Sequence, residues 1–177
     1  PEAWLVDALA DDPDLIDSGF WGDGTIRIAG RDYNGLAATG CFTEGDMDCL
    51  SCHSMHDAPP ADQLRADARG DAACTACHPR EAAAGVAHTH HAPESSGSRC
   101  QNCHMPHTTA GLLTLMRAHR IDSPSVAQSL EQSRPNACNL CHLDRTLGEM
   151  GAALTEWYGH PPPAVVEGRN ATSAAVT

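Results

Sequence analysis

The clearest hydrophobic periodicity lies near the C-terminal end of the chain. Apolar residues recur there at helical spacing and fall on one face: Leu143, Leu147, Met150, Leu154 and Trp157. Thr146 and Glu149 have the spacing of a capping box, and Gly159 before the prolines at 161–163 would end a helix. The pattern therefore predicts a helix over residues 143–157.

Elsewhere the hydrophobic pattern is short and interrupted. Helical spacing predicts only brief helices, over residues 4–9, 61–69 and 112–116. Alternation over residues 25–28, with a turn signal at Asn34-Gly35, predicts a short hairpin near the N-terminus. Residues 121–137 are expected to form an extended loop.

A five-residue pattern, Cys-x-x-Cys-His, occurs four times. It is the attachment signature of c-type haem, in which two thiols form thioethers with the porphyrin and the next His binds the iron. The sequence therefore predicts four covalently bound haems. The expected attachment residues are Cys49, Cys52, Cys74, Cys77, Cys100, Cys103, Cys138 and Cys141, and the expected proximal iron ligands are His53, His78, His104 and His142.

Three other uses of Cys-x-x-Cys compete with haem. A zinc site would combine cysteine pairs two by two and would not require His after every second Cys. A thioredoxin-like redox motif would occur once, near a β-α-β pattern. A disulfide ladder leaves the four histidines unexplained. Haem attachment accounts for every repeated position, and we favour it.

Composition adds a prediction about the core. The chain has 177 residues but only three Trp, two Tyr and two Phe, so porphyrins would have to supply most of the apolar bulk. The expected fold class is mostly irregular, with short α-helices around a haem core and minimal β structure. We expect a cap over residues 1–48 on the first haem, a tetrahaem unit over 49–160 and an extended or flexible tail over 161–177.

Charge and hydropathy restrict the partners and the compartment. The formal charge of −12 argues against nucleic acid and favours basic redox proteins as partners. No run of 18 apolar residues predicts a transmembrane span. Because thioethers to haem form outside the cytoplasm, we expect an exported protein, periplasmic or extracellular, whose export signal was removed before Pro1. The ninth cysteine, Cys41, is expected to be a buried thiol rather than an intermolecular bridge.

The sixth ligand of each iron is less determined. Four proximal positions leave seven of the eleven histidines: His56, His88, His90, His91, His107, His119 and His160. These suffice for four bis-His sites, and the five methionines are expected to fill the core. His160, beside the proline run, is the least expected ligand.

Several further segments resemble a known family. The chain resembles multihaem c-type cytochromes related to the tetrahaem partner of hydroxylamine oxidoreductase. It is more closely similar to the haem-binding part of secreted multihaem proteins with doubled attachment motifs. The similarity spans nearly all of residues 15–160. The matching segments are residues 20–24, 33–36, 49–56, 88–91, 100–106, 117–121, 135–142 and 157–159.

The resemblance implies distal iron ligands. A His three places after a proximal His ligates another haem in that family, which corresponds to His56 here. The spaced pair before the third motif corresponds to His88 and His91, and the His of the Arg-rich segment to His119. His90 and His107 are reserves.

The expected function is therefore electron transfer along closely packed bis-His haems, not catalysis. One form of it is a chain of identical subunits joined head to tail in an extracellular haem filament, and another is a soluble periplasmic shuttle. The alternative is an oxidoreductase with one open haem, acting on a small nitrogen or sulfur compound. Larger relatives carry further haem and repeat segments that this chain lacks, which argues against an enzymatic role.

Overall fold

The computed structural model describes residues 14, 18–28, 30–109 and 114–162. In this part of the chain the elements are short. The helices are α3 (Arg31–Ala37), α4 (Gly40–Thr43), α5 (Ala72–Thr75), α6 (Pro79–Ala84), α7 (Val86–Thr89), α8 (Cys100–His104), α9 (Val126–Gln132) and α10 (Leu147–Tyr158). Single 3₁₀ turns are η1 (Cys49–Ser51), η2 (Ala66–Ala68) and η3 (Ser96–Ser98). The mostly irregular fold with short helices is as predicted.

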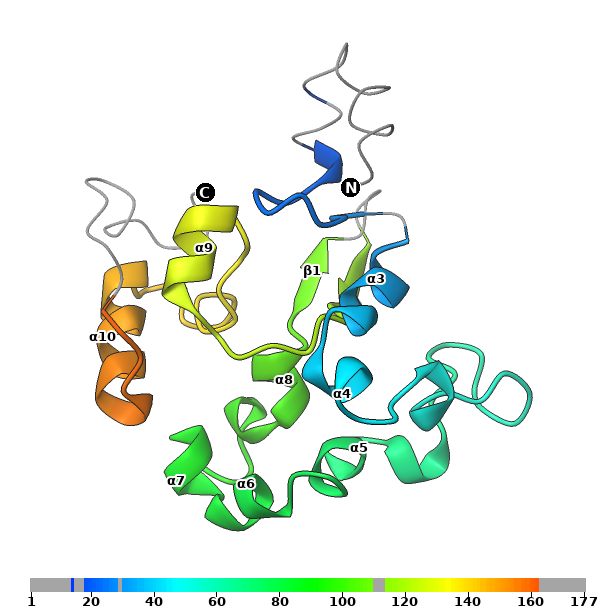
Figure 1. The fold of residues 1–177 in the computed structure, drawn as a ribbon. Helices are drawn as coiled ribbons and strands as arrows, with labels where there is room; N and C mark the ends of the chain where they lie inside the picture. The colour runs from blue at the N-terminus through cyan, green and yellow to red at the C-terminus, as the bar shows by residue number, and fades with distance from the viewer. Residues whose placement is uncertain (1–13, 15–17, 29, 110–113, 163–177) are drawn as a thin grey trace.

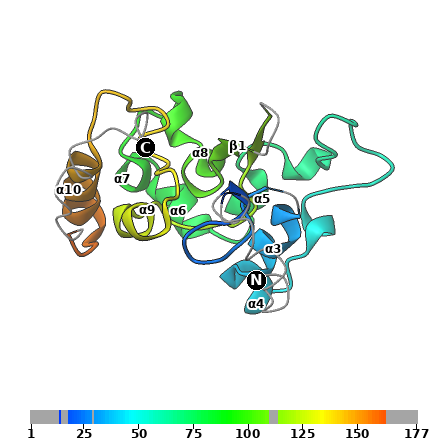
Figure 2. The same ribbon diagram turned by 90° about the horizontal axis from the view of Figure 1, so that it is seen from above.

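The elements surround α8, which lies near the middle of the molecule (Figure 1). Helices α5, α6 and α7 lie on one side of it, α3 and α4 on another, and α9 with α10 on a third. The view from above shows the same separation of α9 and α10 from α3 and α4 (Figure 2). No helix in the described ranges is both long enough and apolar enough to cross a membrane.

Helix α10 confirms the strongest periodicity of the sequence. The Thr146 hydroxyl accepts from the Glu149 amide and the Glu149 carboxylate accepts from the Thr146 amide, which is the predicted capping box. Gly159 ends the helix with a left-handed φ of 69°. The helix begins at Leu147, so Leu143 lies outside it.

The protein core is small and lies between α9 and α10. Four buried side chains form it, with Met150 packed against them: Val126, Leu130, Leu147 and Leu154. Helix α9 corrects the prediction of an extended loop over residues 121–137. Its N-cap is Ser125, whose hydroxyl accepts from the Gln128 amide, and its apolar face is buried only because α10 covers it.

The hairpin is in a different place from the one predicted. Strands β1 (His107–Thr109) and β2 (Leu115–Arg117) pair antiparallel, whereas residues 25–28 form only an isolated bridge, from Ile26 to Phe20. Asn34-Gly35 is not a turn but lies inside α3. A Cβ on Gly35 would lie 2.7 Å from the Arg120 nitrogen, so the glycine is explained by a close approach of two backbones.

Other local predictions also change. Within residues 61–69 the only helical element is η2. Of the helix predicted over residues 112–116, Leu115 and Met116 lie in strand β2, and residues 112 and 113 lie outside the described part of the chain. Cys41 lies in α4 and is partly exposed, not buried. The helix predicted over residues 4–9 lies outside the described residues, as does most of the predicted tail.

Candidate haem sites

Each Cys-x-x-Cys-His motif folds as a single helical turn. In the first, second and fourth motifs the amide of the histidine donates to the carbonyl of the first cysteine, at 2.9, 2.9 and 2.8 Å. The third motif is α8 itself. Residues three and four positions apart share one face of a helix, so each motif presents two thiols and an imidazole on one side. Attachment of one porphyrin by two thioethers and one axial nitrogen requires this arrangement.

Six of the nine cysteines, Cys100 and Cys138 among them, are partly buried, and the other three are exposed. All nine cysteines are described and each is a free thiol. Burial raises the pKa of Cys100 to about 11, with a contribution from the Asp71 carboxylate. Burial also raises the pKa of Cys138 to about 11, with a contribution from Cys103. A thioredoxin-like site needs the opposite shift, because the thiolate is its nucleophile, so these thiols give that alternative no support.

The histidines face one another in pairs. The ring centres of His53 and His119 are 6.1 Å apart, with 32° between the ring planes. Those of His88 and His104 are 6.2 Å apart and parallel within 2°. Those of His91 and His142 are 5.8 Å apart, at 41°. Three expected proximal ligands thus each face an expected distal ligand, and each pair joins segments that are distant or separate in the sequence.

The spacing of these rings fits one metal ion between two imidazoles. A metal–nitrogen bond to histidine is about 2 Å long, and a ring nitrogen lies about 1 Å from its ring centre, so two ligands in line place their ring centres about 6 Å apart. A structural zinc ion would need four converging ligands instead. Among the described residues no three His, Cys, Asp or Glu side chains converge in that way.

The second ring nitrogen of four of these histidines already has an acceptor. The Nδ1 atoms of His53, His91 and His104 lie 3.0, 2.6 and 2.9 Å from the carbonyls of Asp62, Thr89 and Asp122. Nδ1 of His119 lies 3.2 Å from the Arg117 carbonyl. A carbonyl only accepts, so Nδ1 carries the proton and Nε2 is left with a free lone pair. Metal-binding histidines are usually oriented in this way.

Burial also favours the metal-binding form of His104. It lowers the pKa of this ring, against the opposing effect of the hydrogen bond to the Asp122 carbonyl. The imidazole is therefore neutral near pH 7, and only the neutral ring offers a lone pair to a metal.

Residues 117–122 contribute to two of the histidine pairs. Arg117 donates to the carbonyls of Gln101 and Met105, at 3.0 and 3.1 Å, and so is anchored to α8. His119 follows two residues later. Three residues beyond it, the Asp122 carbonyl accepts the hydrogen bond from Nδ1 of His104. One short segment therefore supplies a facing ring to the first motif and the orienting acceptor to the third.

Residues 88–97 hold the other rings. A Cβ on Gly97 would overlap the His91 ring, so only glycine leaves room for that imidazole. The Tyr158 hydroxyl at the end of α10 donates to the His88 carbonyl at 2.5 Å. Since His88 and His91 are three residues apart, this segment faces the third and the fourth motif together.

The remaining two expected ligands are not brought together. His56 is exposed and makes no ring contact with another described residue. Within the same described ranges, His78 contacts only the Glu81 carboxylate, with 3.9 Å from Nδ1 to oxygen, and its side chain is 58% exposed. The second motif therefore has no facing imidazole in the described part of a single chain.

The reserve histidines have other surroundings. His90 stacks on Trp157, with 4.2 Å between ring centres, and His107 lies exposed in β1. His160, the least expected ligand, packs against Tyr158 with 5.9 Å between the ring centres. The sequence analysis did not predict the residues that surround the rings. Two of them, Gly35 and Gly97, are of a type that often marks a close approach of two segments.

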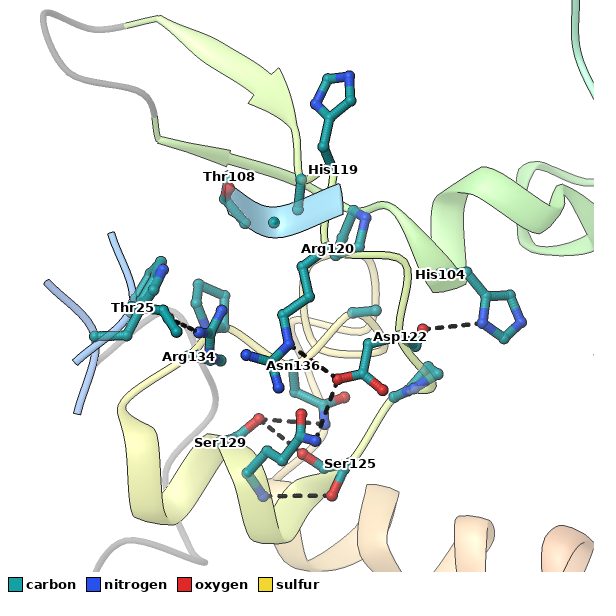
Figure 3. Close-up of a pocket in the computed structure, with 18 of the residues that line it drawn as sticks. Thr25, His104, Thr108, His119, Arg120, Asp122, Ser125, Ser129, Arg134 and Asn136 are labelled. Carbon is teal, nitrogen blue, oxygen red and sulfur yellow. Dashed lines mark hydrogen bonds and ion pairs between the residues drawn. The ribbon is translucent and has the colours of Figure 1, made fainter. Parts of the chain in front are cut away.

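A polar network lies beside His104 and His119 (Figure 3). Arg120 donates to the carboxylates of Asp23 and Asp122, at 3.2 and 3.3 Å, and Arg134 donates to Asp23 at 3.0 Å. In Figure 3 the His119 imidazole points away from this network, whereas the His104 ring is hydrogen-bonded to the backbone carbonyl of Asp122. The ion pairs join Arg120 and Asp122, next to the two histidines, to Asp23 and Arg134, and none of these ion pairs uses a ring nitrogen.

Comparison with known proteins supports the interpretation of the motifs. Residues 40–83, which contain the first two motifs, match the family model of the doubled CXXCH motif. No curated protein and no solved structure gives a significant match to the chain.

The polar network makes a prediction about acid stability. Burial raises the pKa of Asp23, but hydrogen bonds from Thr25 and Arg134 outweigh this effect and lower the pKa to about 2. The contribution of this carboxylate to stability is thus present above pH 4 and is lost as the pH falls towards 2. We expect Asp23→Asn to lower the free energy of unfolding of the haem-loaded protein by about 1–2 kcal/mol at pH 7.

Denaturant unfolding followed by circular dichroism from pH 7 to pH 2 tests this prediction. The difference between wild type and Asp23→Asn should close as the pH approaches 2. Asp144→Asn is the matched control, because that side chain is 77% exposed and pairs only with its neighbour Arg145. An equal effect of the two substitutions at pH 7 would contradict the assigned role of Asp23.

Proposed function

From a chain whose first two motifs form the doubled CXXCH unit typical of multihaem c-type cytochromes, we propose that the protein is a tetrahaem cytochrome that carries electrons. The observation that carries this proposal is that three motif histidines each face a second imidazole at a ring spacing of 5.8–6.2 Å. The axial pairs would be His53 with His119, His104 with His88 and His142 with His91. Haem, when bound, supplies one-electron iron chemistry.

Paired imidazoles favour electron transfer over catalysis. Two histidines on one iron fill both axial positions, so no substrate can bind there. The chain's own contribution is then to hold each pair of rings at a fixed spacing and to keep Nε2 available through the hydrogen bond at Nδ1. Rigid ligation of this kind suits a haem iron that gains and loses one electron without changing its ligands.

The short bridging segments support an order for the haems. Residues 117–122 join the first and third sites, and residues 88–91 join the third and fourth. The second motif is tied to the third by the Asp71 carboxylate, which accepts from the Cys100 amide at 2.9 Å. Gly70 likewise accepts from the Gln101 side chain at 3.0 Å. We therefore place the third haem at the centre, in contact with the other three.

The second motif distinguishes two candidate functions. An open sixth position at the haem of His78 would allow a small nitrogen or sulfur compound to bind, which is the enzyme alternative. A histidine from a second copy of the chain would instead close the site. His56 is exposed and unpaired among the described residues, so it is available to do this.

We favour the second copy. If His56 of one copy bound the second haem of the next, the contact would be heterologous, and a heterologous contact that does not close gives a filament. The redox partners would then include identical subunits. C-type cytochromes are usually exported, and we propose a periplasmic or extracellular location for this one.

The haem content is the first prediction. We expect four haems per chain in the fully matured protein, because each motif presents its two thiols and imidazole on one face. A pyridine haemochrome assay against protein mass measures the ratio. The variant Cys138→Ala/Cys141→Ala should give three haems, and a wild-type ratio of three or fewer would reject the count.

A ligand variant gives the second prediction. His119→Ala should leave four haems attached but open the iron above His53, so that the reduced protein binds carbon monoxide at one more haem in four than wild type does. The midpoint potential of that haem should rise, because a ligand that stabilises ferric iron is lost. Absorbance titration with carbon monoxide checks this, with His160→Ala as the control. Equal binding by wild type and His119→Ala would remove His119 from the ligand set.

The size of the particle is the third prediction. Wild type should be low-spin at all four haems and should assemble, as measured by light scattering and electron microscopy. His56→Ala should give monomers with one high-spin haem, whereas the exposed control His107→Ala should assemble normally. A wild-type monomer with one high-spin haem in four, which turns over nitrite or hydroxylamine, would support the enzyme instead.

A further inference from the structure

One proposed iron ligand lies against a carboxylate. Oδ1 of Asp32, in the first turn of α3, is 2.8 Å from Nδ1 of His119. This oxygen is buried and has no hydrogen-bond partner among the described residues, so its approach to the ring is a charge contact and not a hydrogen bond. The nearest cation is Arg31, whose Nε is 3.9 Å from the same oxygen. The carboxylate therefore has the His119 ring as its closest polar neighbour.

His119 differs in this respect from the other oriented rings. Nδ1 of His53, His91 and His104 meets a neutral backbone carbonyl. Nδ1 of His119 lies 3.2 Å from the Arg117 carbonyl and only 2.8 Å from the negatively charged carboxylate of Asp32. Of the other described imidazoles, His78 has a carboxylate nearby, but at 3.9 Å, and the His78 side chain is 58% exposed against 25% for His119.

Helix α3 is held so that this contact persists. The Arg31 side chain, 7% exposed, donates to the Thr108 hydroxyl at 2.8 Å and to the Thr109 and Met116 carbonyls at 3.0 and 3.1 Å. Gly35 brings the other end of α3 against the backbone at His119 and Arg120. Both attachments lie in or next to the hairpin that leads to His119, so Asp32 and the imidazole are fixed to the same frame.

Arg31 offsets the charge of Asp32 only in part, because its nearest nitrogen is 3.9 Å from the carboxylate oxygen, against 2.8 Å for Nδ1 of His119. The two guanidinium Nη groups are engaged by oxygens of the hairpin, and only Nε, without a hydrogen bond of its own, faces the carboxylate. The negative charge therefore acts mainly on the ring nitrogen next to it. A carboxylate on the outer nitrogen of a metal-binding histidine raises the basicity of the ring.

We propose that Asp32 is a positioning residue for His119, which fixes its ring with Nε2 towards the iron and lowers the reduction potential of that one haem relative to a haem whose ligands meet only carbonyls. A more basic ligand stabilises ferric iron more than ferrous iron. This inference rests on the proposed function, because it requires His53 and His119 to be the axial pair of one haem.

Asp32→Asn in the haem-loaded full chain is the test. The amide keeps the size of the side chain and an acceptor oxygen but removes the charge. We expect the reduction equilibrium of one haem to shift about tenfold towards the reduced form, which is about 59 mV for a one-electron couple. The other three midpoints should stay within error. The low-spin ferric resonance of one haem in four should change its g-values.

Two companion variants make the result interpretable. Asp46→Asn removes the same charge from an exposed side chain near the first motif and should leave all four midpoints unchanged. His119→Ala identifies which midpoint belongs to the affected haem, because that haem alone should bind carbon monoxide.

The outcomes separate the two proposals. If His119→Ala opens an iron but Asp32→Asn leaves all four midpoint potentials unchanged, as Asp46→Asn does, the role of Asp32 is overturned and the ligand assignment stands. If His119→Ala opens no iron, the assignment of the axial pair fails and the role of Asp32 fails with it. A shift in Asp32→Asn confined to the midpoint identified by His119→Ala supports both.

Discussion

In the proposed haem sites, the spacing between facing imidazoles is the constraint on which the rest of the arrangement depends. One metal ion between two histidines sets the distance between their rings to about 6 Å, and a slightly larger separation would break one bond. Three pairs of rings meet this distance. Each ring must also carry its proton on the outer nitrogen, and backbone carbonyls within 3.2 Å impose this on four of the six.

Short segments with two tasks satisfy these constraints in a small protein. Residues 117–122 provide a ring for one site and an acceptor for another, and residues 88–91 provide rings for two sites. Helix α8 is bound by Arg117 on one side and approached by His88 on another. Sharing of this kind couples the sites mechanically, since a shift of one segment moves two rings.

Two cations of this acidic protein, the buried Arg31 and the half-buried Arg117, are satisfied largely by the backbone. Arg31 and Arg117 donate to carbonyl oxygens of the hairpin and of α8, where they replace hydrogen bonds that short elements cannot make for themselves. Carboxylates appear near the rings in only a few places. A negative charge at one ligand and neutral carbonyls at the others would make the haems unequal although their axial ligands are the same.

The sequence by itself determined what depends on residues close together in the chain. Five consecutive residues make the turn that presents two thiols and a histidine, so the four motifs and their attachment residues could be predicted without a structure. Helix α10 could also be predicted, because the bond between Thr146 and Glu149 and the stop at Gly159 are local. The thin protein core followed from the composition.

Only the tertiary structure decided which rings face each other, because 66 positions separate His53 from His119 and no local rule joins them. It decided that Asn34-Gly35 lies in a helix, since the close approach of Gly35 to Arg120 is a contact between distant segments. It decided that residues 126–132 are helical, because their apolar face is buried only against α10. The residues that approach the rings, Asp32 among them, belong to the same class, because their contacts with the rings exist only after folding.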